Sequence, residues 1–197
     1  FDGEFDPAKV FTPQDVVSAW IQFKERTFRE WNAFVKGAAA IDTSVIPPII
    51  FESWKRSREY GLDPHGETKN EILTGQALDR LFEDNRLLIE ISQPFLNRLY
   101  QSMKTTSFSV TLSDSNGYIL QIMQHDMHEG LHKLFKWIPG VLWSEECCGT
   151  NAIGTLLKCK KPFQIIGAQH YMQLFHMLTV SSAPILDPDG EMIGGIT

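Results

Sequence analysis

The sequence predicts an α+β fold, in which an antiparallel sheet of about five or six strands is flanked by helices and preceded by an N-terminal helical arm. An Asp-Ser-Asn-Gly turn at 114–117 separates two segments, 108–113 and 118–124, whose apolar and polar residues alternate as in strands. A second turn, Asp-Pro-Asp-Gly at 187–190, lies between two further strand patterns. In the N-terminal half, apolar residues recur instead at helical spacing.

Composition excludes several classes of protein. The chain has 197 residues and a formal net charge of −6, and its Lys and Arg are scattered, so we expect no direct contact with nucleic acid. Three Cys make no disulfide framework and fit a reducing cytoplasm. No apolar run approaches the ~20 residues needed to span a membrane. The chain lacks an initiator Met and stops directly after an expected strand, so we expect a fragment of a longer protein.

Residues 1–40 are expected to form a loose tail and an aromatic amphipathic helix. Thr12, Pro13 and Asp15 have the pattern of a helix start, with a cap, a proline in the first turn and an acidic residue three positions after the cap. Gly37 is a plausible stop. Such a helix either packs on its own domain or pairs with its copy, and we favour a homodimerisation arm. The stripe comprises Val17, Trp20, Ile21, Phe28, Trp31 and Val35.

Residues 41–70 are expected to contain a linking helix, and residues 71–197 a sensor domain truncated before its last helix. Pro47-Pro48 opens the linking helix and a Gly-Leu-Asp-Pro segment at 61–64 closes it. Its basic residues, Lys55, Arg56 and Arg58, are interpreted as a solvated face. A helical pattern follows over 71–104, and Pro94 is expected to kink or divide it.

Residues 143–154, Trp-Ser-Glu-Glu-Cys-Cys-Gly-Thr-Asn-Ala-Ile-Gly, form the stretch around which we expect a site to be arranged. Thr150 or Asn151 can cap a helix that continues through Leu157. A helix start of this kind offers unpaired N–H groups to a small polar or anionic ligand.

Several separated motifs resemble the GAF sensor domain of sigma-54-dependent transcriptional activators of the acetoin-catabolism-regulator type, with its GAF/PAS-like fold. The motifs are Trp143-Ser144-Glu145, Gly149-Thr150-Asn151-Ala152-Ile153-Gly154-Thr155, Gln169-His170-Tyr171, the Ser-Ala-Pro-Ile-Leu-Asp-Pro-Asp-Gly run at 182–190, and Ile-Phe-Glu-Ser-Trp-Lys-Arg-Ser at 50–57.

The resemblance implies a cytoplasmic bacterial domain that binds a small-molecule effector. It also implies attached ATPase and DNA-binding domains that lie outside this chain. No Gly-x-x-x-x-Gly-Lys-Ser/Thr loop is present, so the chain itself is expected to sense rather than to hydrolyse ATP. We therefore expect a non-enzymatic sensor without a cofactor.

The effector pocket is predicted from the positions of residues within this fold. An apolar rim with a few convergent hydrogen-bonding groups is the usual composition of a small-molecule site. The predicted lining residues are Met123, His125, Trp143, Thr150, Asn151, His170, Tyr171, His176 and Ser181.

A metal or gas sensor is one alternative reading. His128 and His132 are four residues apart, so they would share a helix face, and His125 lies nearby. Two imidazoles with a carboxylate would suit non-haem iron.

A thiol-dependent methionine sulfoxide reductase is a second alternative, because some GAF-fold proteins have this activity. Cys147, Cys148 and Cys159 could supply an attacking and a resolving thiol. Adjacent cysteines bridge only with strain, which disfavours this reading.

Overall fold

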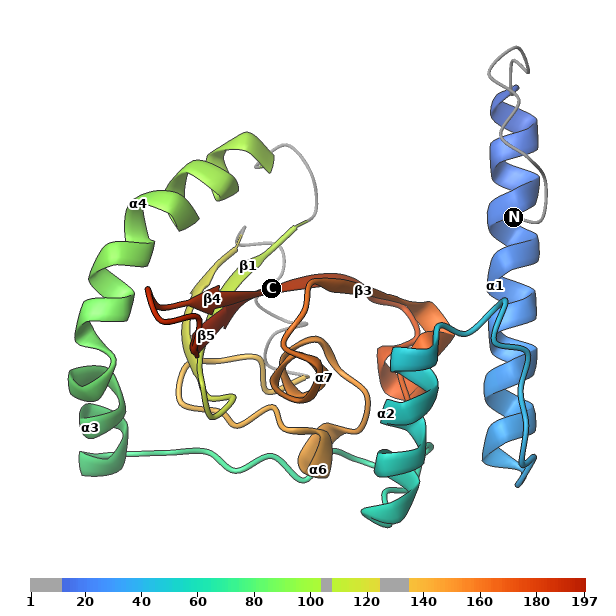
Figure 1. Cartoon of the computed structure of the whole chain (residues 1–197), viewed down its shortest axis with the longest axis horizontal. Coiled ribbons are helices and arrows are strands. Elements are labelled where there is room, and N and C mark those ends of the chain that lie inside the picture. Colours follow the sequence, from blue (N-terminus) through green and yellow to red (C-terminus); the bar gives the residue numbers. More distant parts are fainter. Residues whose placement is uncertain (1–11, 104–107, 125–134) are drawn as a thin grey trace.

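The computed structural model describes residues 12–103, 108–124 and 135–197, and its centre is a five-stranded antiparallel sheet (Figure 1). The strand order is β2-β1-β5-β4-β3, so the last strand of the chain is central. This confirms the predicted α+β fold. The strands are β1 (Val110–Asp114), β2 (Ile119–Met123), β3 (Phe163–Ile166), β4 (Thr179–Leu186) and β5 (Met192–Ile196).

Helices cover both faces of this sheet. Ile119 packs in one hydrophobic cluster with Ile153 of α7, while its neighbour Leu120 packs in a second cluster with Leu96 of α4. Because successive strand residues point to opposite faces, α7 and α4 lie on opposite sides of the sheet. The helices are α1 (Pro13–Val35), α2 (Pro48–Glu59), α3 (Gln76–Asp84), α4 (Arg86–Met103), α6 (Glu145–Cys148) and α7 (Ala152–Cys159), with short 3₁₀ turns η2 (Gly167–Gln169) and η3 (Gln173–Phe175).

Two glycines in the central strand allow both helices to approach it closely. A Cβ atom at Gly194 would lie 2.6 Å from the carbonyl oxygen of Ser113 on β1 and 2.9 Å from a methyl of Leu88 on α4, and one at Gly195 would lie 2.5 Å from a methyl of Leu156 on α7. Either substitution would force these neighbours to move.

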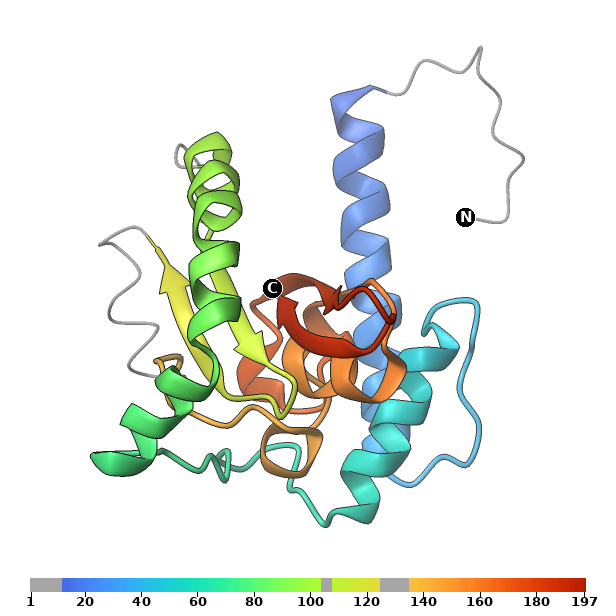
Figure 2. The same ribbon diagram turned by 60° about the vertical axis from the view of Figure 1, so that its left-hand side comes forward.

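The helix α1 is divided between a packed half and an exposed half. Its start is the predicted capping box of Thr12 and Asp15. Near its end, Trp31 and Phe34 are buried, and Trp31 Nε1 donates to the carbonyl oxygen of Tyr171 at 2.8 Å. The N-terminal half extends past the rest of the molecule (Figure 2). This half exposes apolar side chains, among them Trp20. The C-terminal half therefore belongs to the core, and the dimerisation role of the other half stays a prediction.

The expected helix over 71–104 differs from the structure in where it starts and where it breaks. Residues 71–75 are not helical, and the break between α3 and α4 falls at Asn85 rather than at Pro94. Asn85 Nδ2 donates to the carbonyl of Leu81 at 2.9 Å and so competes with the continuing helix. Pro94 lies inside an unbroken α4, where the carbonyl of the exposed residue Glu90 can bond to water instead.

Candidate functional site

A cavity of about 1040 Å³ opens between the end of α4, the start of β1, the 135–143 segment, the start of α7 and the β3–β4 pair. This volume is at the upper end of the ~300–1,000 Å³ typical of small-molecule sites. The wall is mainly apolar, and no described lining residue carries a charged side chain. Its aromatic members are Phe108, Phe135, Trp137, Trp143, Phe163 and Phe175.

The aromatic wall is held in place by its own contacts. The rings of Trp137 and Trp143 meet edge to face with centroids 4.4 Å apart, and Trp143 lies 5.3 Å from Phe175. Trp137 Nε1 also donates to Thr111 Oγ1 on β1 at 2.8 Å. Sequence reasoning missed Trp137 and Phe175, although the density of aromatic residues around 135–143 was a usable signal.

His170 is the buried titratable group of this wall. Its side chain is almost fully buried, and Nδ1 lies 3.0 Å from the carbonyl oxygen of Gly167. A carbonyl can only accept, so Nδ1 carries the proton of this bond. Burial lowers the pKa of His170 from 6.5 to about 4, with a smaller contribution from His176. The imidazole is therefore neutral near pH 7, with Nδ1 protonated.

Asn151 lies at the cavity and caps α7. Its Oδ1 accepts from the backbone N–H groups of Ile153 at 3.0 Å and Gly154 at 2.8 Å, while Nδ2 donates to the Gly149 carbonyl at 2.8 Å. The expectation that this helix start offers free N–H groups to an anion is therefore wrong for these two donors, because the carboxamide of Asn151 already satisfies them.

Four of the predicted site residues line the cavity together: Trp143, Asn151, His170 and Ser181. They come from the 143–154 stretch, the segment after η2, and β4, which the fold brings to one place. Ser181 Oγ accepts from Gln164 Nε2 at 2.9 Å across the β3–β4 pair. Their contact with an effector stays a prediction.

The structure places four other predicted residues away from this cavity. Met123 packs in the cluster beneath α4. The Tyr171 hydroxyl donates to the Leu62 carbonyl at 3.1 Å, and the ring of His176 lies 4.5 Å from that of Trp31. These side chains fasten the segments 60–64 and α1 to the domain. Thr150 joins a separate polar network, and His125 falls outside the described residues.

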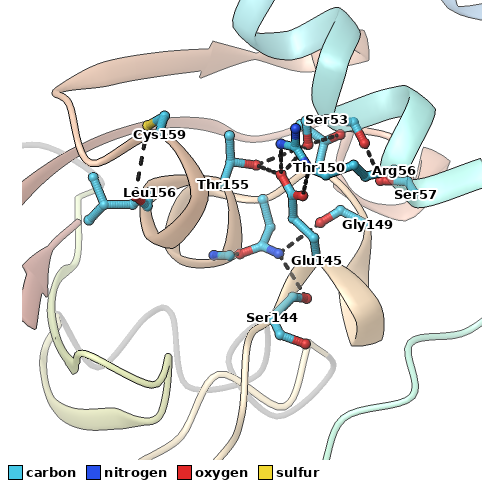
Figure 3. Close-up of polar contacts among 12 residues, drawn as sticks. Ser53, Arg56, Ser57, Ser144, Glu145, Gly149, Thr150, Thr155, Leu156 and Cys159 are labelled. Carbon is cyan, nitrogen blue, oxygen red and sulfur yellow. Dashed lines mark hydrogen bonds and ion pairs between the residues drawn. The ribbon is translucent and has the colours of Figure 1, made fainter. Parts of the chain in front are cut away.

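That network surrounds Glu145, a fully buried carboxylate on α6 (Figure 3). Arg56 on α2 binds it through two bonds, Nε to Oε2 at 2.6 Å and Nη2 to Oε1 at 2.9 Å. The hydroxyls of Thr155 at 2.8 Å and Ser53 at 2.5 Å also contact Oε1, and Ser53 Oγ lies 2.7 Å from Thr150 Oγ1. A buried charge needs such partners because it has lost its hydration.

The interpretation of the α2 basic residues as a solvated face is therefore wrong for Arg56. The bond to Glu145 raises the pKa of Arg56, so this residue is a permanent cation against the buried carboxylate. Arg58 donates to the Phe34 carbonyl and stacks over the Phe34 ring at 3.6 Å. Arg58 is nevertheless solvent-exposed, as is the side chain of Lys55, which pairs with Glu52. Sequence reasoning missed Glu145 because its partners are distant in the chain.

Close backbone contact brings this network next to the cavity wall. A Cβ atom at Gly154 would lie 2.4 Å from the backbone nitrogen of Glu145, so α6 and α7 can meet this closely only with glycine at this position. Thr150 in the network immediately precedes Asn151 in the cavity wall. A movement of Asn151 in the cavity wall would therefore act directly on Thr150, the next residue, and on the network that holds α2.

The described residues show neither a metal site nor an activated thiol at Cys148. Among the described residues, no group of three His, Cys, Asp or Glu side chains is placed to hold an ion, and His125, His128 and His132 lie outside that part of the chain. Cys148 is buried, and this burial raises the pKa of its thiol. Asn70 Nδ2 lies 3.0 Å from its Sγ. A thiol held protonated is a poor nucleophile.

No helix within the described ranges is long and apolar enough to cross a membrane.

Comparison with known proteins gives a consistent family assignment. The family described as "MimR, N-terminal domain" matches residues 26–197. The acetoin dehydrogenase operon transcriptional activator AcoR of Bacillus subtilis is 31% identical over 84% of this chain and 27% of its own length. The propane 2-monooxygenase operon transcriptional activator MimR of Mycolicibacterium goodii is 27% identical over 81% of this chain and 26% of its own. The chain thus spans about a quarter of these curated relatives.

A solved structure supports the fold. The crystal structure of the Escherichia coli DhaR(N)–DhaL complex matches with a TM-score of 0.72 at 17% identity, covering 76% of this chain and 51% of that one.

Proposed function

The chain belongs to the MimR N-terminal domain family, and we propose on that premise that it is the effector-sensing region of a sigma-54-dependent activator. A small organic molecule binds in the cavity and controls an attached ATPase module. The observation that supports this proposal is the aromatic cavity of about 1040 Å³, a pre-formed site of the size and composition used for small ligands. The relatives themselves are transcriptional activators.

Effector binding in the cavity would be coupled to α2 through α7 and α6. An effector at Asn151 touches the residue next to Thr150, which lies in the Glu145 network. That network holds α2 through Arg56. A ligand shifts a regulatory equilibrium only by its difference in affinity for the two states, so the wall at Asn151 must differ between them.

Native mass spectrometry of the purified chain, with metal analysis of the same sample, tests the proposal. A co-purified organic mass that disappears in Trp143→Ala is the expected result. The matched control is Trp20→Ala, the same substitution at an exposed residue of α1, which should retain the mass. Stoichiometric iron without an organic ligand would overturn the proposal in favour of a metal sensor. An organic mass retained in Trp143→Ala would place the ligand elsewhere.

We also propose that the exposed half of α1 mediates homodimerisation. Val17 and Ile21 are each 50% exposed and lie one turn apart, so they present an apolar surface that water does not favour. The double variant Val17→Glu with Ile21→Glu should sediment as a monomer without loss of folding, because neither residue is in the core. An unchanged sedimentation coefficient relative to the wild type would refute this role.

A further inference from the structure

One hydrogen-bond acceptor in the cavity wall makes no hydrogen bond to the residues that the structure describes. The second ring nitrogen of His170, Nε2, makes no hydrogen bond within the described part of the chain, whereas Nδ1 is held by the Gly167 carbonyl at 3.0 Å. With the proton fixed on Nδ1, Nε2 keeps a lone pair. His170 lines the cavity, and Nε2 is not among the fully enclosed unpaired atoms of the described residues, so a molecule in the cavity can reach this acceptor. A hydrogen-bond acceptor in an otherwise apolar wall favours a ligand that supplies a donor to it.

The charge state of the imidazole supports this tautomer. No carboxylate among the described lining residues is present to stabilise an imidazolium, and the titratable group acting on His170 is another histidine, His176, which disfavours the charged form. The ring is therefore neutral at physiological pH. His170 acts as an acceptor at Nε2, not as a cationic donor.

The surrounding wall selects against charged ligands. The described lining residues include no Lys, Arg, Asp or Glu, and the space around His170 is bounded by rings such as Phe175, at 6.0 Å between centroids. An organic carboxylate or phosphate would lose its hydration there without a counter-charge from these lining residues.

We propose that the cavity takes an uncharged, largely apolar alcohol or phenol whose hydroxyl donates to His170 Nε2. This inference rests on the proposed effector-binding function and names the chemical class of the effector. Ketones and ethers of the same shape offer only acceptors, so they would leave Nε2 unpaired. His170 is thus a specificity-determining residue of the cavity.

Three probes with one ring system test the inference by isothermal titration calorimetry at pH 7.5: 1-naphthol, 1-methoxynaphthalene and 1-naphthoate. We expect 1-naphthol to bind roughly tenfold more tightly than its methyl ether, the ordinary effect of one buried hydrogen bond. The carboxylate should bind at least about a hundredfold more weakly than 1-naphthol. Equal affinities for 1-naphthol and the ether would overturn the hydroxyl assignment and leave the small-molecule function standing. Binding of none of the three would overturn both.

Two variants then place the selectivity at His170. His170→Leu removes the acceptor, so 1-naphthol and the ether should bind with equal affinity. His170→Gln retains an amide oxygen that can accept while its NH₂ donates to the Gly167 carbonyl, so part of the preference should return. A tenfold preference that survives in His170→Leu would refute the role of Nε2. If His170→Leu does not fold, the wild-type ratio and His170→Gln still decide the question.

Discussion

Replacing Arg56 with Met should destabilise the fold far more than its position on a partly exposed helix suggests. The substitution keeps most of the aliphatic stem and removes the guanidinium that makes both charged bonds to Glu145. Glu145 then remains as a buried carboxylate, with only the hydroxyls of Ser53 and Thr155 as partners in the network. Its side chain is 0% exposed, so water cannot replace the lost cation.

The magnitude follows from the burial of the two partners. Breaking a buried ion pair from one side costs ~3–5 kcal/mol. The Arg56 side chain is 29% exposed, so solvent already screens part of the pair and we expect a loss at or just below the lower end of this range, about 2–3 kcal/mol. That is a large share of the ~5–15 kcal/mol by which a domain is stable.

Urea denaturation of a double-mutant cycle measures this contribution. Arg56→Met, Glu145→Gln and the double variant should show a coupling free energy of about 1–3 kcal/mol. The control is Lys55→Met, the same substitution one residue earlier on α2. Lys55 is 42% exposed and pairs with the 56% exposed Glu52, so its loss should change stability by no more than ~1 kcal/mol.

Two results would refute the reasoning. One is a loss in Arg56→Met no larger than that in Lys55→Met. The other is additivity of Arg56→Met and Glu145→Gln, which would show that the two side chains do not stabilise each other.

Three further predictions concern other buried groups. Burial lowers the pKa of His170 from 6.5 to about 4, so the unfolded chain binds more protons between these values; stability should be complete above pH 6.5 and fall by up to about 3 kcal/mol towards pH 4. Acid titration of His170→Gln should show a shallower fall, with a remainder from His176, whose pKa burial also lowers to about 4; an unchanged slope would contradict this. Trp31→Phe removes the N–H bond to a buried carbonyl and should cost ~1–3 kcal/mol in urea, against ~0.5 or less for Trp20→Phe on the exposed half of the same helix. Because burial raises the pKa of its thiol, Cys148 should resist alkylation by iodoacetamide at pH 8 in the native state and react in urea. Equal alkylation rates of Cys148 in the native and the urea-unfolded chain would show that its thiol is not buried.

Elements controlled by neighbouring residues could be predicted from the sequence. The start of α1 depends on a capping box within Thr12 and Asp15, and the turn before β2 depends on Asp114, whose carboxylate accepts from the backbone N–H groups of Asn116 and Tyr118. Both bonds span at most four residues, so the pattern contains all the interacting groups. The family, the sheet and four lining residues of the cavity followed from such patterns and from separated motifs.

The tertiary structure decided the features whose partners are far apart in the chain. Arg56 and Glu145 are 89 residues apart, and a lone Arg on an amphipathic helix has the same local pattern whether it faces water or a buried carboxylate. Met123 and Tyr171 likewise have side chains suited to a pocket, yet packing against α4 and the Leu62 carbonyl uses them elsewhere. Local patterns specify hydrogen-bonding capacity, whereas which partner meets that capacity depends on how the helices dock on the sheet. For the same reason, only the tertiary structure shows which ring nitrogen of His170 bonds to the Gly167 carbonyl and which has no partner among the described residues.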